Sequence, residues 1–180
     1  MIKINMGCGW RNFGDDWIHI DGGDYDHLNH HCITELSFIE DSTVDLIYAS
    51  HVIEYFDREE VLEVFKEWKR VLKDGAILRI AVPDFESMSK MYVNGEITLK
   101  QMLGPLYGKM NMGDNIIYHK TVYDFESMKN LLTKAGFHDI MIYDWRTTEH
   151  AQFDDHSQAY IPHMDKENGT LVSLNVECAK

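Results

Sequence analysis

The stretch NMGCGWRNFGDDWIHID, residues 5–21, decides the fold that this chain predicts. IKINM at 2–6 has the apolar pattern of a short strand that runs into Gly7, and WIHID at 17–21 has the pattern of a second strand. The ten residues between the two strands are fewer than the dozen or so that a parallel crossover usually needs. We therefore expect the helix between these strands to be absent or a single turn.

Strands and helices alternate over the next part of the chain. VDLIYAS at 44–50 is a near-continuous apolar run, which is typical of a strand buried in a parallel sheet. Residues 57–74 place apolar side chains on one helical face, and Gly75 follows as a helix C-terminal glycine. Asp57 and the glutamate three residues later have capping-box spacing. AILRIAV at 76–82 completes a strand–helix–strand unit, for which right-handed parallel geometry is the default.

The rest of the chain predicts a short helix, a longer helix and two strands. Residues 83–92 suggest a short helix, and the glycine- and methionine-rich segment 102–115 predicts an irregular surface excursion. A helix with an apolar face follows at 124–136, and HDIMIYDW at 138–145 predicts a strand. LVSLNVEC at 171–178 alternates apolar and polar side chains, the pattern of a half-buried strand.

This order of elements predicts an α/β fold. Strands that alternate with helices and end in two consecutive strands indicate a three-layer sandwich, with a mostly parallel sheet and a C-terminal antiparallel hairpin. A chain of 180 residues fits one core of ordinary size, so we expect a single domain, 1–180. Ligands of such sheets bind beyond the carboxyl ends of the strands. Gly7, Asp21, Ser50 and Asp84 all lie at or just beyond the carboxyl ends of strands and should meet in one crevice.

Charge and composition exclude several classes of function. The formal net charge of −13, without a basic cluster, argues against nucleic acid as a partner. The three cysteines are scattered and form no CxxC pair, which argues against disulfides and a cysteine zinc site. No apolar run is long enough to span a membrane, and the N-terminus lacks a signal-peptide pattern. We therefore expect a cytoplasmic protein with reduced thiols.

Glycines and one carboxylate suggest what the crevice holds. Gly7 and Gly9 lack a Cβ and allow the backbone to approach a ligand. Asp21, at the end of the second strand, is suited to accept hydrogen bonds from two ribose hydroxyls. A dinucleotide fingerprint would need a third glycine at position 12, where the chain has Asn12. An adenosine-containing cofactor other than a dinucleotide is therefore favoured, and an NAD-dependent oxidoreductase is the less favoured alternative.

Five motifs, taken in order, resemble a known family. INMGCGW, HID, VDLIYASHVIEYF, VLKDGAILRIAVPD and LLTKAGF are similar in order and spacing to the motifs of class I S-adenosylmethionine-dependent methyltransferases. The tail from residue 153 also resembles the compact, type 11-like branch of that family, which is often associated with surface-polysaccharide genes. The resemblance implies a Rossmann-like fold and S-adenosylmethionine as the cofactor.

The resemblance also assigns the cofactor site. It implies that Gly7, Cys8 and Gly9 line the methionine part, that Asp21 binds the ribose, and that Ser50 and His51 close the far wall. Backbone groups of Ile33 and Thr34 would contact the adenine edge. Many relatives carry an aspartate just before that stretch, whereas this chain has Cys32.

Methyl transfer to a hydroxyl needs alignment and a proton acceptor. The sulfonium loses its methyl group without acid catalysis, so the enzyme mainly aligns the reactants, while the hydroxyl must lose a proton to a histidine or carboxylate. His119, before the helix at 124, is the first candidate base, followed by His51 and then Asp84. The alternatives are that His51 only positions the cofactor, that His119 caps a helix and that Asp84 lies in an ordinary turn.

The aperiodic loop 146–170 should cover the acceptor side of the crevice, since a long loop in a compact domain is often functional. Its polar side chains predict recognition of a small hydroxylated acceptor such as a sugar: Asp154, Asp155, His156, Tyr160 and His163. A divalent metal site is a rival interpretation, but no tight ligand pair supports it, and we expect no metal. A solvated loop with local hydrogen bonds is the third possibility. The prediction is O-methylation of a small molecule or saccharide; a protein that binds the cofactor without turnover is the alternative.

Overall fold

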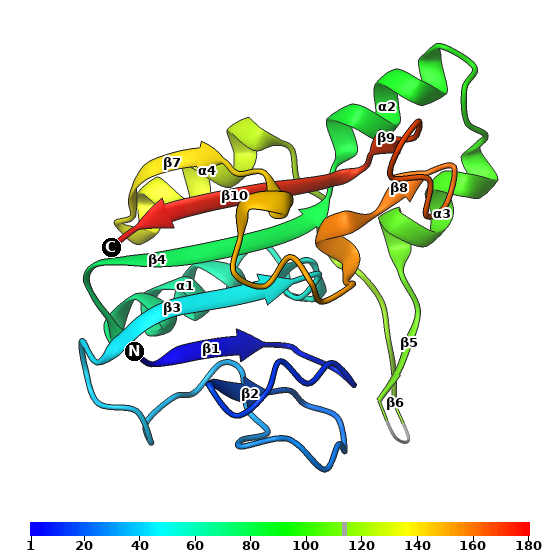
Figure 1. The fold of residues 1–180 in the computed structure, drawn as a ribbon. Helices are drawn as coiled ribbons and strands as arrows, with labels where there is room; N and C mark the ends of the chain where they lie inside the picture. Colours follow the sequence, from blue (N-terminus) through cyan, green and yellow to red (C-terminus); the bar gives the residue numbers. More distant parts are fainter. Residues whose placement is uncertain (113–114) are drawn as a thin grey trace.

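The computed structural model describes residues 1–112 and 115–180 and is built around a mixed sheet (Figure 1). Within the described residues this sheet has six strands in the order β2-β1-β3-β4-β10-β7. The strands are β1 (Lys3–Met6), β2 (Trp17–Ile20), β3 (Val44–Ser50), β4 (Leu72–Pro83), β7 (His138–Ile142) and β10 (Ser173–Ala179). The pairs β1–β2, β1–β3 and β3–β4 are parallel, whereas β10 is antiparallel to both of its neighbours. The mostly parallel sheet with an antiparallel C-terminal strand confirms the predicted fold class.

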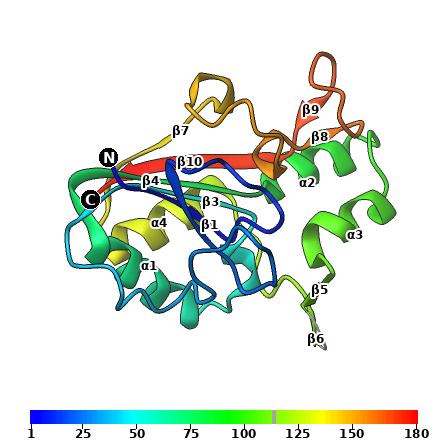
Figure 2. The same cartoon turned by 60° about the horizontal axis from the view of Figure 1, so that its bottom comes forward.

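Two helices cover one face of the sheet. They are α1 (Glu60–Val71) and α4 (Phe125–Ala135), which contact each other on the same side (Figure 2). Trp68 and Phe65 of α1 are fully buried in the main core, as are Met128 and Leu132 of α4. This layer therefore arises from the apolar stripes that the sequence pattern predicts.

The boundaries of α1 differ from the expected ones at one end. The Asp57 carboxylate accepts hydrogen bonds from the amides of Glu59 and Glu60, and the Glu60 carboxylate accepts one from the Asp57 amide, so the capping spacing is used. The predicted role of Gly75 as the helix C-terminal glycine is wrong. The helix ends at Val71 and the chain enters β4 at once, while Gly75 has a φ of +77° and donates to the Lys180 carbonyl.

Loops cover the opposite face. A small cluster of Phe13, Trp17, Leu46 and Tyr48, with Phe153 packed against it, joins the segment after β1 to the segment after β7. Residues 7–16 contain no helix, so the short first connection is confirmed. The third layer of the sandwich thus consists of turns, including the 3₁₀ turns η2 (Trp145–Thr147) and η3 (His156–Gln158). A loop layer leaves room at the carboxyl ends of the strands.

The segment after β4 is more regular than predicted. It forms α2 (Phe85–Val93), α3 (Leu99–Tyr107) and a hairpin of β5 (Met110–Met112) with β6 (Asn115–Ile117). The irregular prediction for 102–115 is wrong for the described part, because Thr98 and Gln101 form a capping box that starts α3. Residues 113–114 of that prediction lie outside the described residues.

The last strand is buried on both faces. Ser173 and Asn175 were expected on a solvated face, yet they are 4% and 1% exposed. The loop around η3 covers them, and the Asn175 amide donates to the Ser157 carbonyl at 2.9 Å. This loop also carries the small hairpin of β8 (Tyr160–Ile161) and β9 (Thr170–Leu171), which lies beside α2 and α3 (Figure 1). None of the helices in the described ranges has the length and apolar character of a membrane span.

Candidate active site

The turn after β1 adopts the backbone geometry that its glycines permit. Gly7 and Gly9 have φ angles of +65° and +55°, in the left-handed region that favours glycine. A Cβ at Gly7 would overlap the Cγ2 atom of Val52, whereas a Cβ at Gly9 would meet no atom within 4 Å. The backbone is thus packed tightly against η1 (Ile53–Tyr55) at Gly7 and faces open space at Gly9.

Asp21 ties this turn to the end of β2. Its side-chain oxygens accept hydrogen bonds from the backbone amides of Gly9, at 2.8 Å, and Gly23, at 2.7 Å. A carboxylate oxygen has two lone pairs, so each oxygen retains acceptor capacity beyond these bonds. Asp21 directly follows β2, as expected, and it is 9% exposed. It is therefore a largely buried acceptor that holds the two glycine loops together.

The remaining predicted cofactor residues lie around the ends of β2 and β3. Burial and the nearby Asp21 raise the pKa of the Cys8 thiol to about 12, so Cys8 packs as a small neutral side chain. The Ile33 carbonyl already accepts the Trp68 indole N–H at 2.8 Å. Thr34 lines a cavity of about 470 Å³ together with Tyr55 and Phe56. Ser50 ends β3, and its buried Oγ has no hydrogen-bond partner.

A larger cavity, of about 850 Å³, lies beyond the carboxyl ends of β3 and β4. It is lined by His51, by Pro83 at the end of β4, by α3 and by the loop from η3 to β9. Residues from both predicted sets line it: His51, His119, Asp154, Asp155, His156, Tyr160 and His163. The structure thus brings two of the three candidate bases together with the predicted acceptor loop. Gly7, Asp21 and Ser50 do not line this cavity.

His51 has an unusual backbone and one free nitrogen. Its φ is +55°, a left-handed conformation that costs a non-glycine residue roughly 1–2 kcal/mol. Its Nδ1 lies 3.5 Å from the Glu54 carboxyl, and its buried Nε2 has no hydrogen-bond partner. Burial, reinforced by the nearby His156 and His119, holds the pKa of His51 well below its ordinary range, so the ring is neutral near pH 7. Strain of this kind is commonly retained at functional sites.

His119 is held from the other side of the cavity. Its Nδ1 lies 2.9 Å from the Pro105 carbonyl, which only accepts, so Nδ1 carries a proton and the Nε2 of the neutral ring does not. That Nε2 lies 3.8 Å from the same Glu54 oxygen that faces His51. Burial lowers the pKa of His119. Gly108 is required beside it, because a Cβ there would overlap the ring.

Glu54 is the main site residue that the sequence analysis missed. It is 1% exposed, and neither carboxyl oxygen has a hydrogen-bond partner. Burial raises its pKa to about 8. Its position in the predicted motif VDLIYASHVIEYF, three residues after His51, was the available signal, because i and i+3 side chains share one side of a helical turn.

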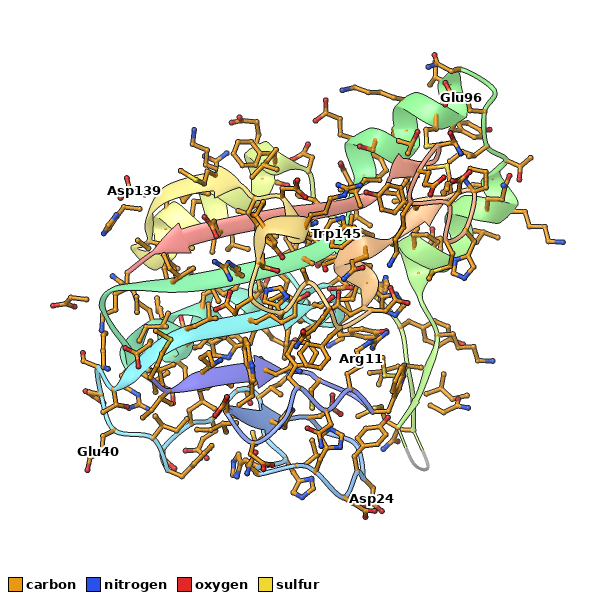
Figure 3. The ribbon with its side chains drawn as sticks, in the orientation of Figure 1. Arg11, Asp24, Glu40, Glu96, Asp139 and Trp145 are labelled. Carbon is orange, nitrogen blue, oxygen red and sulfur yellow. The ribbon has the colours of Figure 1, made fainter. Side chains whose placement is uncertain are left out.

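Arg11 is the second residue that the sequence analysis missed. It lines the large cavity, and its Nε donates to the Asp154 carbonyl at 3.0 Å. Figure 3 shows Arg11 where the loop after β1 meets the segment around η3. This cation joins the predicted cofactor loop to the predicted acceptor loop.

Three of the predicted polar residues have structural partners. Asp155 is 7% exposed and binds the Tyr48 hydroxyl, at 2.6 Å, and the Ser157 amide. The Tyr160 hydroxyl accepts from Arg146 at 2.8 Å. Asp84 caps α2, since its carboxylate accepts from the amides of Glu86 and Ser87 and from the Ser87 hydroxyl. Asp84 therefore acts as the N-terminal cap of this helix.

Asp154, His156 and His163 remain more accessible. All three are exposed and line the cavity, and the Asp154 carboxylate pairs with Lys166 at 2.9 Å. Within residues 1–112 and 115–180, no group of three or more histidine, cysteine or acidic side chains has the arrangement of a metal site. The accessible face of the loop thus presents hydrogen-bonding side chains to the cavity.

The buried Glu54 predicts a specific pH dependence of stability. The unfolded carboxyl loses its proton near its ordinary pKa of 4.5, whereas the folded one keeps it until about pH 8. Between these values the folded state binds more protons, so stability falls as pH rises, by up to roughly 5 kcal/mol. When urea unfolding is measured at pH 5, 7 and 9, we expect the wild type to lose stability relative to Glu54→Gln as the pH rises.

A matched control is the exposed Glu96→Gln, in the loop between α2 and α3 (Figure 3), which should keep the wild-type pH dependence. Parallel pH curves for wild type and Glu54→Gln would contradict the assigned burial of this carboxyl.

Comparisons with known proteins identify a family match for part of the chain and similar folds for the whole chain. The model of a family described as "Methyltransferase domain" matches residues 24–80, which is less than half of the chain and includes β3, α1 and most of β4. No curated protein matches the chain significantly. The fold is similar to solved S-adenosylmethionine-dependent methyltransferases.

Residues 24–80 match a methyltransferase domain, and the whole chain has the fold of solved S-adenosylmethionine-dependent methyltransferases. A SAM-dependent methyltransferase from Archaeoglobus fulgidus aligns over 99% of this chain and 86% of its own, with 16% identity and a TM-score of 0.59. One from Methanosarcina mazei aligns over 99% of this chain and 92% of its own, with 15% identity and a TM-score of 0.58. The methyltransferase domain and its fold confirm the family resemblance, the enzyme class and S-adenosylmethionine as the expected cofactor.

A third related structure contains ligands. The Burkholderia thailandensis 1,6-didemethyltoxoflavin-N1-methyltransferase, with bound 1,6-didemethyltoxoflavin and S-adenosylhomocysteine, aligns over 99% of this chain and 70% of its own. Its identity is 10% and its TM-score is 0.55, so the similarity to this methyltransferase domain concerns the fold.

Proposed function

We propose that this methyltransferase transfers a methyl group from S-adenosylmethionine to a hydroxyl of a small molecule or saccharide. The observation that carries the proposal is the 850 Å³ cavity with neutral histidines at its wall, His51 and His119. Pockets of roughly 300–1,000 Å³ are typical for small organic ligands. A hydroxyl must lose a proton during methylation, and a neutral imidazole is suited to accept it.

The cofactor would lie at the ends of β1 and β2. Gly9 leaves open space beside a left-handed backbone, and Asp21 offers acceptor capacity suited to the ribose hydroxyls. The cavity beside Thr34, Tyr55 and Phe56 offers an aromatic surface for adenine. When bound, S-adenosylmethionine supplies an electrophilic methyl group on a sulfonium. The chain's own contribution is to hold this group and the acceptor in line.

The acceptor would occupy the large cavity. Asp154, His156 and His163 supply hydrogen-bonding groups from one loop, while the Arg11 guanidinium supplies donors from the other. Several separated donors and acceptors suit a molecule with several hydroxyl groups, such as a sugar. The histidines at the cavity wall also favour a hydroxyl over an amine as the target. A hydroxyl needs a base to accept its proton, whereas a neutral amine attacks without prior loss of a proton.

The test is methyl transfer from radiolabelled S-adenosylmethionine to matched panels of nucleotide sugars, free glycans, phenols and amines. We expect label in a hydroxyl compound. Label found only in amines would contradict the oxygen assignment, while tight cofactor binding without any product would favour the non-catalytic alternative. Binding of NAD without binding of S-adenosylhomocysteine would favour an oxidoreductase.

The ribose assignment gives a separate prediction for Asp21. Asp21→Ala should raise the dissociation constant of S-adenosylhomocysteine by about tenfold or more, because charge-assisted hydrogen bonds to the ribose are lost. Calorimetry with the 2′-deoxyribose analogue sharpens the test. Wild type should bind the analogue more weakly than the parent compound, whereas Asp21→Ala should bind both equally.

The control for Asp21 is the exposed Asp24→Ala, three residues further along the loop after β2 (Figure 3), which should keep wild-type affinity. The ribose assignment is wrong if Asp21→Ala keeps wild-type affinity, or if the variant still discriminates against the deoxy analogue.

A further inference from the structure

The buried Glu54 carboxyl lies where two histidines of the acceptor cavity meet. One oxygen, Oε1, lies 3.5 Å from His51 Nδ1 and 3.8 Å from His119 Nε2. A buried polar group without partners is costly, by roughly 1–3 kcal/mol for a neutral group and more for a charge. Tyr123, whose hydroxyl is also buried and unpartnered, lies close enough for Glu54 to raise its pKa further. An apolar residue at position 54 would avoid this cost, so the carboxyl calls for a functional explanation.

The two histidines differ in the nitrogen they offer. His119 is fixed by the Pro105 carbonyl, and its unprotonated Nε2 points to the Glu54 side. His51 presents Nδ1 to Glu54, while its Nε2 has no hydrogen-bond partner. Of the two, only His51 can therefore donate to the carboxylate through one nitrogen and keep an unpartnered lone pair on the other, a nitrogen that is itself buried in a side chain lining the cavity.

We propose that Glu54 is a positioning residue that accepts the Nδ1–H of His51 and so makes His51 Nε2 the base for the acceptor hydroxyl. This inference rests on the proposed function and changes its leading base from His119 to His51. The carboxylate has a second role, because burial makes His51 a weak base and a negative charge beside Nδ1 opposes that effect.

The step balances within the proposed reaction. The hydroxyl proton passes to His51 Nε2 as the hydroxyl oxygen bonds to the methyl carbon. The carbon–sulfur bond breaks, and its electron pair remains on the sulfur as a neutral thioether. His51 becomes an imidazolium, and the Glu54 carboxylate stabilises it.

The groups that face this pair set its pH dependence. His119, Tyr55 and Tyr123 face Glu54, and His156 and Arg11 act on His51 from the loop side. The carboxylate form of Glu54 becomes populated as pH rises through about 8, its pKa in the folded protein. Turnover of the wild type should therefore rise as the pH is raised through about 8.

The first experiment compares Glu54→Gln, His51→Gln and the double variant by their turnover. Glu54→Gln should lower kcat by roughly a hundredfold, abolish the rise of activity near pH 8 and change the dissociation constant of S-adenosylhomocysteine by less than about twofold. The double variant should be no slower than His51→Gln alone, because Glu54 acts through His51. Glu96→Gln is the exposed control.

Three outcomes would overturn the assignment. The first is a pH profile of turnover that Glu54→Gln leaves unchanged. The second is a double variant of Glu54→Gln and His51→Gln whose loss of kcat is the product of the two single losses. The third is a double variant of Glu54→Gln and His119→Gln that is no slower than His119→Gln alone. Methyl transfer that a chelator abolishes and Mg²⁺ restores would also overturn the assignment.

A second experiment needs no methyl acceptor and separates this inference from the proposed function. Nitrogen-15 NMR of histidine-labelled protein at pH 9 should show His51 protonated at Nδ1 and unprotonated at Nε2, and Glu54→Gln should shift this tautomer ratio. An unaltered ratio would reject the role of Glu54 even if methyl transfer occurs. Failure of S-adenosylhomocysteine to bind would reject the proposed function and leave the NMR result to decide on Glu54.

Discussion

His51→Gln is expected to lower kcat by roughly a hundred- to ten-thousand-fold, the range that general base catalysis supplies. Glutamine keeps polar atoms in the side chain but offers no basic nitrogen. Cofactor affinity should change by less than about threefold, because the base acts on the acceptor. Single-turnover kinetics with saturating labelled cofactor, together with calorimetry, measures the two effects separately.

Two matched histidine variants test whether the loss of kcat is specific to His51. His119→Gln should cost less than His51→Gln, since Nδ1 of His119 is held by the Pro105 carbonyl and its Nε2 faces the Glu54 carboxyl at 3.8 Å. His138→Gln, at an exposed ion pair on β7, should keep full activity. A greater loss in His119→Gln than in His51→Gln would restore His119 as the base, the first candidate from the sequence.

Gly7→Ala is expected to destabilise the fold by roughly 3 kcal/mol or more. The new methyl group would overlap Val52 Cγ2 in the main core, and alanine at a φ of +65° adds roughly 1–2 kcal/mol of backbone strain. Overpacking of a well-packed core typically costs 1–3 kcal/mol. Urea unfolding with a common slope for wild type and variant measures the sum of both effects.

Gly9→Ala is the matched control, because Gly9 has a similar φ of +55° but open space around its Cβ position. It should cost only the strain, roughly 1–2 kcal/mol. Val52→Ala combined with Gly7→Ala should recover part of the loss. Equal destabilisation by Gly7→Ala and Gly9→Ala would contradict the close packing of Gly7 on Val52.

The fold could be predicted from the sequence where local signals and burial agree. Apolar runs such as VDLIYAS and the face of α1 with Trp68 gave the sheet and its helices. The prediction was wrong where tertiary contacts override a pattern. Asn175 alternates like a solvated residue, yet a loop more than ten residues away in sequence covers it through Ser157. Gly75 is a residue type common at helix C-termini, yet in the structure it lies in the first part of β4.

The site could be predicted only in part. The glycines and Asp21 follow strands, and strand ends converge in a parallel sheet, so their meeting is a matter of topology. Glu54 escaped because burial, which gives it its character, cannot be read from a short motif. Asp84 and Asp155 are carboxylates that could equally bind a ligand, and only the folded structure shows that Asp84 caps α2 and that Asp155 accepts from the Tyr48 hydroxyl.

A crystal structure of the complex with S-adenosylhomocysteine tests the central claim most directly. The account predicts ribose hydroxyls within hydrogen-bonding distance of the Asp21 carboxylate, the amino-acid end along the turn at Gly7 and Gly9, and the sulfur facing the cavity wall at His51. A ligand whose ribose lies away from Asp21, or whose sulfur faces away from His51, would contradict it.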